Sequence, residues 1–325
     1  MSGTEFDIIK RYFSTGDISR ADVILGIGDD GAVLQVPGGK ELVVSIDTLV
    51  AGIHFPEDTD AASIGYKAMA VNLSDMAAMG AEPAWATLSL TLPEADHSWL
   101  QAFSRGFFEL ANQFKVQLVG GDTCRGPLSI TVQLHGFVNN GKYLRRDTAQ
   151  PGDFIYVTGT LGDAGLGLYL KNGKFDVQGK DYEYLLQRLD RPTPRIGEGI
   201  GLQGVGHAVI DISDGLISDL GHILAASQAG ATLYADMIPT SPSFNAYKEL
   251  ITEGTWIDMA ISSGDDYELC FTIDPKSRDI LHERLPNIPC TCIGEINVSS
   301  GLRCILENGK EFIPAAAGYD HFRGR

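Results

Sequence analysis

The segment DAASIGYKAMAVNLSDMAAM, Asp60 to Met79, is the element around which the fold can be predicted. Its apolar residues recur at helical spacing, which predicts an amphipathic helix with Asp60 near the N-cap. The predicted apolar stripe comprises Ile64, Ala68, Val71, Asp75 and Ala78. A carboxylate within an apolar face is costly to bury unless it is paired or bound to a metal ion. Asp75 is therefore a candidate metal ligand, with a structural ion pair as the alternative.

A strand pattern precedes this helix. One face of the strand predicted at residues 42–47 carries Leu42, Val44 and Ile46. The other face carries Ser45 and Asp47, which can therefore offer oxygen atoms to the same point. The strand predicted at residues 208–212 repeats this alternation, with Asp211 and Ser213 on one side.

The remaining elements alternate between helix and strand. Helices are predicted from Phe6 to Phe13, after Pro93, and at residues 216–226. Further strands are predicted at residues 85–92, 116–119, 128–138, 154–158, 231–234, 269–273 and 292–296. Turn chemistry at residues 149–153 marks a boundary, so we expect two domains, 1–150 and 151–325. The predicted fold class is α/β (α+β mixed).

The composition excludes several kinds of protein. The chain has 325 residues and a net charge of −17, which counts against nucleic-acid binding and against electrostatic attachment to an anionic membrane. It has no apolar run of the roughly 18 residues that a transmembrane helix needs. The first ten residues show no signal-peptide pattern. The five cysteines form an odd, sparse set, which favours reduced thiols and a cytoplasmic protein.

Five short segments combine aspartate with glycine, serine or asparagine: residues 28–31 (GDDG), 45–47 (SID), 72–75 (NLSD), 120–122 (GGD) and 211–215 (DISDG). Oxygen-rich, histidine-poor sites suit hard cations such as Mg²⁺ and do not suit zinc. The segments do not match the calcium loop of an EF-hand, and no P-loop is present. The sequence therefore favours a magnesium site built from several segments.

Each of these motifs taken alone has a simpler interpretation. Residues 29–31 could be a surface turn. Residues 120–122 follow the strand predicted at 116–119, so their backbone N–H groups could face a phosphate or could simply form a turn. Arg145 and Arg146 could be a solvated linker pair, and residues 262–268 could hold a ligand or merely connect two elements.

Taken together, the motifs make the chain similar to the bacterial thiamine-monophosphate kinase family, within the aminoimidazole ribonucleotide synthetase-like superfamily. The resemblance runs nearly end to end. Its motifs are GIGDDGAV (26–33), SIDTLVAGIHF (45–55), NLSDMAAMGAEP (72–83), GGDTCRG (120–126), DISDGL (211–216), SGDDYEL (263–269) and GYDHF (318–322).

The resemblance implies an ATP-dependent phosphorylation of thiamine monophosphate to thiamine diphosphate, the last step of thiamine diphosphate biosynthesis. It implies an N-terminal ATP- and Mg²⁺-binding domain that pairs with its twin in a homodimer, and a C-terminal domain that completes the active site. The implied Mg²⁺ ligands are Asp30, Ser45, Ile46 through its carbonyl, Asp47, Asp75, Asp122, Asp211 and Asp214. The implied ATP contacts are Gly121, Asp122, Arg146 and Ser213. The implied substrate contacts are His54, Asp265 and Tyr319.

The chain departs from the family pattern in three places. Ile46 stands where threonine is usual, and Cys124 stands where threonine or serine is usual. Residues 315–317 are alanines where an aromatic residue often stacks on the substrate, so Tyr319 or Phe312 is expected to replace it.

The expected chemistry needs no general base. Both substrates are polyanions, and unit charges 4 Å apart repel by about 4 kcal/mol at an effective dielectric constant of 20. The chain has few basic residues, so bound Mg²⁺ must neutralise the phosphates. The accepting phosphate, with a second pKa of about 6, is already ionised at pH 7, which leaves in-line positioning as the main task. The alternatives are another ATP-using enzyme of the superfamily and a non-catalytic nucleotide- or metal-binding regulatory protein.

Overall fold

The computed structural model describes residues 4–14, 16, 19–173, 175, 177–252, 254–315 and 318–319. The chain forms two compact units. The first comprises Met1–Met76 and Ala81–Tyr143, and the second comprises Ala77–Gly80 and Leu144–Arg325. The second unit thus begins before the turn at residues 149–153, where the sequence predicts the boundary. Among the described residues, no helix has the length and hydropathy needed to cross a membrane.

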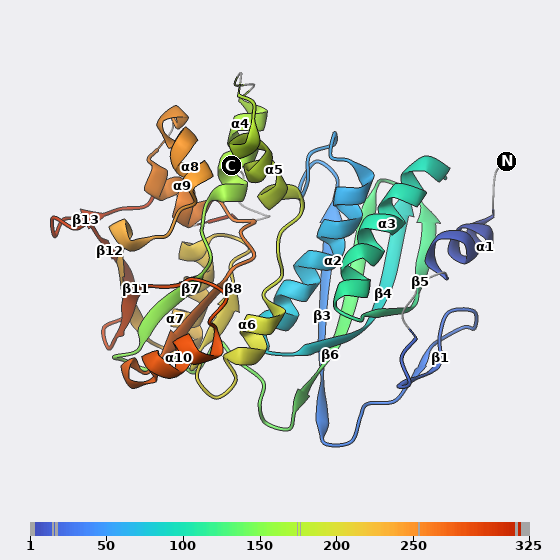
Figure 1. The fold of residues 1–325 in the computed structure, drawn as a ribbon, viewed down its shortest axis with the longest axis horizontal. Coiled ribbons are helices and arrows are strands. Elements are labelled where there is room, and N and C mark those ends of the chain that lie inside the picture. The colour runs from blue at the N-terminus through green and yellow to red at the C-terminus, as the bar shows by residue number, and fades with distance from the viewer. Residues whose placement is uncertain are drawn as a thin grey trace. The chain divides into compact units, whose positions relative to one another are not determined.

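A four-stranded sheet forms the centre of the first unit, in the order β3 (Lys40–Val50), β6 (Ser129–Asn139), β4 (Glu82–Leu92) and β5 (Gln117–Arg125). The β4–β5 pair is parallel and the other two pairs are antiparallel. Figure 1 shows α2 (Ala61–Ala78) and α3 (His97–Gln113) side by side over this sheet. Glycine allows their close approach, because a Cβ on Gly106 would lie 1.8 Å from the carbonyl oxygen of Ala62.

Shorter elements precede this sheet. The chain begins with α1 (Glu5–Ile8), which continues into a π-helix, η1 (Ile9–Phe13), so the predicted first helix is confirmed. The strands β1 (Val23–Leu25) and β2 (Val33–Leu34) then pair antiparallel. The loop between them carries the GDDG motif.

Helix α2 confirms the predicted helix, and Asp60 Oδ1 accepts a hydrogen bond from Ser63 N at 3.0 Å. The predicted stripe is buried at Ile64, Ala68 and Val71. Polar residues outside the stripe are buried as well, among them Lys67, Asn72 and Ser74. Asp75 is only half-buried. The expectation of one apolar face was therefore wrong, because this helix is enclosed on several sides and its polar residues also lie inside.

The helix predicted to open at Pro93 begins later. α3 starts at His97, and Asp96 is its N-cap residue. The Asp96 carboxylate accepts hydrogen bonds from Ser98 N at 2.8 Å and Trp99 N at 3.3 Å. Capping by this side chain, rather than the fixed φ of proline, sets the first turn.

The GGD motif lies inside a strand and not in a turn after one. β5 extends from Gln117 to Arg125, so Gly121 pairs with Leu88 of β4 in parallel register. A Cβ on Gly121 would lie 1.9 Å from the Leu88 carbonyl oxygen. The interpretation of residues 120–122 as a strand-to-loop turn was therefore wrong, and glycine is needed at 121 for close approach of the two backbones.

The second unit is built on a seven-stranded sheet in the order β13-β12-β9-β11-β7-β10-β8. The bounds are β7 (Phe154–Thr158), β8 (Val209–Asp211), β9 (Gly230–Tyr234), β10 (Leu269–Ile273), β11 (Cys290–Asn297), β12 (Gly301–Ile305) and β13 (Glu311–Phe312). Only β9 and β12 pair in parallel. The five strands predicted in this unit are confirmed, whereas β12 and β13 were not predicted.

Helices pack on this sheet and complete its core. They are α4 (Asp163–Asn172), α5 (Lys180–Asp190), α6 (Ile196–Gly201), α7 (Leu216–Ser227), α8 (Pro242–Tyr247), α9 (Trp256–Ser262) and α10 (Arg278–Arg284). Single 3₁₀ turns form η2 (Ala235–Met237), η3 (Lys248–Leu250) and η4 (Pro275–Ser277). The core contains fully buried Ile155, Leu166 and Phe244. Helix α7 confirms the helix predicted at residues 216–226.

All five cysteines are free thiols. Cys270 and Cys304 are buried, Cys290 and Cys292 are half-buried, and Cys124 is exposed. Burial raises the pKa of Cys290 to about 12 and that of Cys304 to about 11. These thiols are therefore protonated at neutral pH and poorly nucleophilic.

Candidate active site

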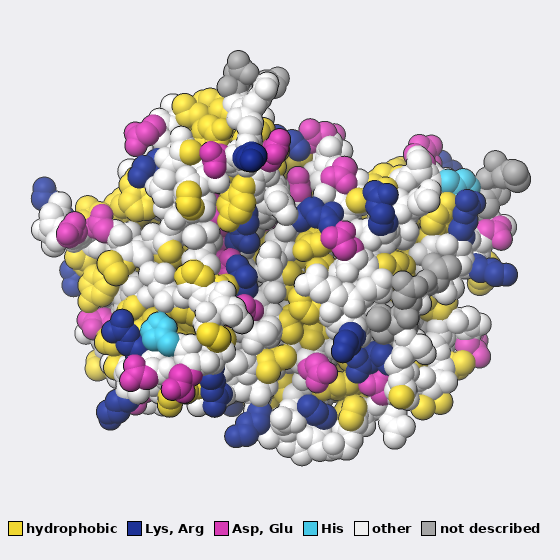
Figure 2. Space-filling model, in the orientation of Figure 1, with side chains coloured by type: hydrophobic (Ala, Val, Ile, Leu, Met, Phe, Trp, Pro, Cys, Tyr) yellow, Lys and Arg dark blue, Asp and Glu magenta, His cyan; other side chains and the backbone are white. Residues whose placement is uncertain are grey.

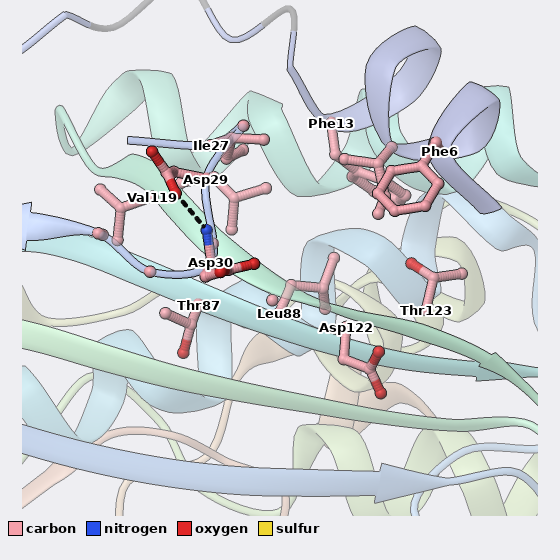
Figure 3. Close-up of a pocket in the computed structure, with 17 residues that line it drawn as sticks. Phe6, Phe13, Ile27, Asp29, Asp30, Thr87, Leu88, Val119, Asp122 and Thr123 are labelled. Atoms are coloured by element: carbon pink, nitrogen blue, oxygen red, sulfur yellow. Dashed lines mark hydrogen bonds between the residues drawn. The ribbon is translucent and has the colours of Figure 1, made fainter. Parts of the chain in front are cut away.

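A cavity of about 520 Å³ opens in the first unit. The N-terminal helical segment supplies Phe6 and Phe13, the β1–β2 loop supplies Asp29 and Asp30, and β5 supplies Gly120, Gly121 and Asp122. In Figure 3 the two aromatic rings lie at the end of the cavity opposite the Asp29–Asp30 loop. The structure thus brings together three of the predicted residues, Asp30, Gly121 and Asp122. The cavity has an apolar end and an acidic, glycine-lined end.

The acidic end is open to solvent. Asp30 and Asp122 are both exposed. Asp30 N donates a hydrogen bond to Asp29 Oδ1 at 2.9 Å, which shapes the loop (Figure 3). Residues 29–31 can therefore be a surface turn and also lie at the rim of the cavity.

A second group of predicted ligands lies between β3 and α2. The hydroxyl of Ser45 donates a hydrogen bond to Asp75 Oδ2. Asp47 is half-buried, like Ser45, on the same face of β3. The opposite face carries Leu42, Val44 and Ile46, which are 43%, 49% and 59% exposed. The predicted alternation is confirmed, and the Ile46 side chain points away from Ser45 and Asp47.

These acidic residues do not form one compact cluster. Asp30 and Asp122 line the cavity, and Asp75 lies against Ser45. In the part of the chain that the structure describes, no group of three or more His, Cys, Asp or Glu side chains could hold a metal ion.

His54 lies in a tight turn directly after β3. Val50 N donates a hydrogen bond to His54 Nδ1 at 3.0 Å. This bond requires an unprotonated Nδ1, so the ring is neutral and carries its proton on Nε2. Lys67 is 2% exposed, and its Nζ donates to the His54 carbonyl oxygen at 3.2 Å. The sequence analysis missed Lys67, although a lysine among apolar helical residues is a visible signal.

The second unit gathers four other predicted residues. Asp265 N donates to the Ser213 carbonyl oxygen at 2.8 Å, and Tyr319 N donates to the Asp214 carbonyl oxygen at 3.0 Å. Ser213, Asp214, Asp265 and Tyr319 thus come from three segments to one place. Asp211 is nearby at the end of β8 and is buried.

A cavity of about 620 Å³ lies beside this group. Its walls include Tyr319, Tyr169, Phe175, Ser262 and Ser263. Tyr319 therefore faces a space with aromatic and hydroxyl walls. The expected alternative, Phe312, belongs to β13 and does not line this cavity. Residues 316, 317 and 320–322 of the family motifs lie outside the described residues.

Arg146 is exposed near the start of the second unit. Its carbonyl oxygen accepts a hydrogen bond from Ser227 Oγ at 3.2 Å. Its neighbour Arg145 pairs with Asp147. On the face drawn in Figure 2, basic side chains are scattered among acidic and uncharged ones. That face has no continuous basic surface of the kind that nucleic acid needs.

Asp219 is a further residue that the sequence analysis missed. Its Oδ2 accepts hydrogen bonds from Ser213 N and Asp214 N, both at 3.0 Å. Asp219 is buried, and burial together with the charges of Asp211 and Asp214 raises its pKa to about 8. The signal was the third aspartate of DISDGLISD (211–219), which follows the DISDGL motif by about one helical turn.

The raised pKa of Asp219 predicts a pH dependence of stability in the metal-free protein. Between its ordinary pKa of about 4 and its folded pKa of about 8, the folded state binds a proton that the unfolded state has lost. The free energy of unfolding therefore falls as pH rises through this range. Urea unfolding in EDTA from pH 5 to pH 9 should show a smaller fall for Asp219→Asn than for wild type. Equal slopes would contradict the assignment.

Comparison with known proteins identifies the family of this chain. Residues 28–138 match the family described as AIR synthase related protein, N-terminal domain, and residues 150–307 match the corresponding C-terminal domain. The chain is 48% identical over 325 residues to the thiamine-monophosphate kinase of Escherichia coli strain K12, covering 99% of both chains.

Solved structures agree with these matches. The crystal structure of thiamine-monophosphate kinase from Stenotrophomonas maltophilia K279a superposes with a TM-score of 0.86 at 47% identity, covering 96% of this chain and 99% of that chain. A structure described as AaThiL complexed with AMPPCP and TMP superposes with a TM-score of 0.78 at 32% identity, covering 91% and 92%. The similarity extends through both units, and the chain belongs to the thiamine-monophosphate kinase family.

Proposed function

We propose that this chain transfers the terminal phosphoryl group of ATP to thiamine monophosphate and releases thiamine diphosphate. Like the other members of its family, it is a thiamine-phosphate kinase. The observation that carries the proposal is the cavity of about 520 Å³ with chemically different ends. AaThiL, which is 32% identical, has been solved with AMPPCP and TMP together.

The two ends of this cavity suit the two parts of a nucleotide. Phe6 and Phe13 offer apolar surface to a purine ring. Asp30 lies away from these two rings, and Gly121 and Asp122 of β5 also line the cavity. Backbone N–H groups beside glycine can approach phosphate oxygens closely. We therefore place the base at the aromatic end and the phosphates at the acidic end.

The acidic residues fit magnesium by their donor chemistry. Ser45 and Asp75 are in direct contact and offer hydroxyl and carboxylate oxygens, the hard ligands that Mg²⁺ prefers. Mg²⁺ is usually held by one or two carboxylates together with waters and substrate phosphates, which suits the exposed pair Asp30 and Asp122. The further proposed ligands are Asp47 and the Ile46 carbonyl in the first unit, and Asp211 and Asp214 in the second unit. When bound, Mg²⁺ neutralises phosphate charge in the transition state.

The second unit supplies the contacts to the accepting substrate. Thiamine monophosphate joins a cationic, aromatic vitamin to a phosphate. Asp265 offers a negative charge, and Tyr319 faces the neighbouring cavity with its aromatic walls. In the first unit, the Nε2–H of neutral His54 can donate to a phosphate oxygen. Ser213 and Arg146 complete the proposed nucleotide contacts.

The chain's own residues bind and orient the reactants, and no side chain has to remove a proton. The accepting phosphate has a second pKa of about 6 and is ionised at pH 7. Rate acceleration then comes from in-line alignment and charge stabilisation. The free thiols support our placement of the enzyme in the cytoplasm.

Substrate selectivity tests this function. Purified protein is mixed with ATP and Mg²⁺, and ADP release is measured with thiamine monophosphate, thiamine or an aminoimidazole ribonucleotide precursor. We expect turnover with thiamine monophosphate alone. Turnover only with another acceptor would move the chain to a different reaction of the superfamily, and binding of ATP without turnover would favour a regulatory role.

We also propose a homodimer formed through the outer face of β3. The apolar side chains Leu42, Val44 and Ile46 form an exposed stripe on a strand at the edge of its sheet. Such edges are normally covered in stable proteins.

Light scattering at micromolar concentration should therefore give twice the chain mass of 35.0 kDa. Val44→Asp should halve that mass, because a charge would be buried in the interface. Val298→Asp, at an 82% exposed position of the second unit, is the matched control and should stay dimeric. A monomeric wild type would refute the dimer.

A further inference from the structure

The segment before β10, residues 263–267, has an unusual backbone. Asp265 and Tyr267 have φ angles of +61° and +50°, in the left-handed region that non-glycine residues rarely adopt. Asp265 N and Tyr267 N donate to the carbonyl oxygens of Ser213 and Ile212, each at 2.8 Å. Asp265 is half-buried and its Oδ1 accepts a hydrogen bond from the Tyr267 hydroxyl at 3.2 Å, whereas Asp266 is buried. A conformation of this kind persists only where its surroundings hold it.

A group of buried polar side chains lies directly beneath this segment. We call it the buried cluster: Thr158, Asp163, Arg188, Arg195, Asp266 and Glu268. Glu268 is fully buried and accepts four side-chain hydrogen bonds. Arg195 Nε and Nη2 donate to its two oxygens at 2.6 Å each, Arg188 Nη2 donates at 2.9 Å, and Thr158 Oγ1 donates at 2.6 Å. Two guanidinium groups therefore fix the end of the segment.

Asp266 fixes its middle. The side chain is 1% exposed, and its Oδ1 accepts a hydrogen bond from Gly162 N at 2.9 Å. Arg188 Nη2 donates to the Asp266 carbonyl oxygen at 3.2 Å. Arg188 Nε lies 3.8 Å from Asp163 Oδ2. Arg188 thus links Asp266 and the neighbouring Glu268 to the start of α4.

The charges of the cluster balance if Asp266 is a neutral acid. Asp266 Oδ2 has no hydrogen-bond partner among the described residues. Burial raises the pKa of Asp266 well above its usual value. Burial raises the pKa of Asp163 as well, and the guanidinium groups of Arg188 and Arg195 lie beside Asp163 and Glu268.

The neighbouring loop is shaped to fit this cluster. Gly159 has a φ of +57°, and a Cβ there would lie 2.4 Å from Glu268 Oε1. Gly162 has a φ of +83°, and a Cβ there would lie 2.7 Å from Ala260 Cα. The loop after β7 can therefore close over the two acidic side chains only because glycine stands at both positions.

We propose that the buried cluster is a positioning device for substrate recognition: through Asp266 and Glu268 it holds residues 263–267 in the strained conformation that presents Asp265 beside Ser213 and Asp214. The inference rests on the proposed function, in which Asp265 contacts thiamine monophosphate. Asp266 and Glu268 are positioning residues, since they act through Asp265. A defect in the cluster should therefore weaken binding of the accepting substrate more than binding of ATP, whose proposed cavity belongs to the first unit.

A matched pair of variants tests this proposal in the full chain. Asp266→Asn keeps the acceptor for Gly162 N and the shape of a neutral acid, so its kinetics should stay within about threefold of wild type. Asp266→Ala removes the link and should raise KM for thiamine monophosphate at least tenfold, with KM for ATP changed less than twofold. Equal changes in both KM values, or none in a folded Asp266→Ala protein, would overturn the proposal.

Two further measurements keep the test decisive. If Asp266→Ala fails to fold, Arg195→Lys retains the charge but loses the two-pronged contact with Glu268, and the same split between KM values is expected. Hydrogen exchange of the amides of Asp265 and Tyr267 should speed up in Asp266→Ala and stay slow in Asp266→Asn. Hydrogen exchange does not depend on turnover, so it reports on the positioning role alone. Failure of the proposed kinase activity would instead appear as a wild-type protein without turnover.

Discussion

Replacement of Asp75 by asparagine is expected to lower kcat by about 10²- to 10³-fold and to leave the protein folded. Asparagine has nearly the same volume and keeps an oxygen that can accept the hydrogen bond from Ser45 Oγ. It lacks the negative charge that a magnesium ligand supplies. Because the volume is kept, the substitution leaves no void around the half-buried side chain at position 75.

The measurement is kcat at saturating ATP and thiamine monophosphate over a range of Mg²⁺ concentrations. Asp47→Asn should behave like Asp75→Asn, because both residues face the same side of β3. Asp274→Asn is the matched control, since this aspartate caps η4 through Lys276 N at 2.9 Å and is not one of the proposed ligands. Full activity of Asp75→Asn would remove that residue from the metal site.

Replacement of Gly121 by alanine is expected to lower both the stability of the protein and its affinity for ATP. The added Cβ would lie 1.9 Å from the Leu88 carbonyl oxygen, and no flexible side chain can move aside there because the contact is backbone to backbone. The β4–β5 pairing has to open, which should cost about 3 kcal/mol of stability. The phosphate end of the cavity is built on that same strand, so ATP affinity should fall at least tenfold.

The neighbouring glycine provides the control for this prediction. A Cβ on Gly120 would meet only a methyl group of Thr87, at 4.0 Å. Gly120→Ala should therefore keep its thermal stability close to wild type. Thermal unfolding and titration with a non-hydrolysable ATP analogue compare the two variants. Equal behaviour of Gly120→Ala and Gly121→Ala would contradict the close approach of the strands.

Much of the framework follows from periodicity. The period-2 pattern at residues 42–47 placed Ser45 and Asp47 on one face, and the structure confirms this alternation. The long helical pattern predicted α2 with its cap at Asp60. Both patterns are local, because each depends on side chains that share one face of a single element.

Contacts between different segments of the chain account for the features that periodicity could not predict. The GGD motif looked like a turn because glycines favour turns, but Gly121 is needed in mid-strand, where β4 approaches from elsewhere in the chain. The roles of Asp219 and Asp266 depend on backbone N–H groups of other segments. Lys67 is buried by the turn that carries His54. No spacing within one element reveals such partners.

The most direct test of the central claim follows the phosphoryl group itself. The purified full chain is mixed with ATP labelled at the γ-phosphate, Mg²⁺ and thiamine monophosphate, and the products are separated. The account predicts label in thiamine diphosphate, formed in step with ADP and lost when Mg²⁺ is chelated. Label appearing only in inorganic phosphate, with no thiamine diphosphate formed, would contradict it.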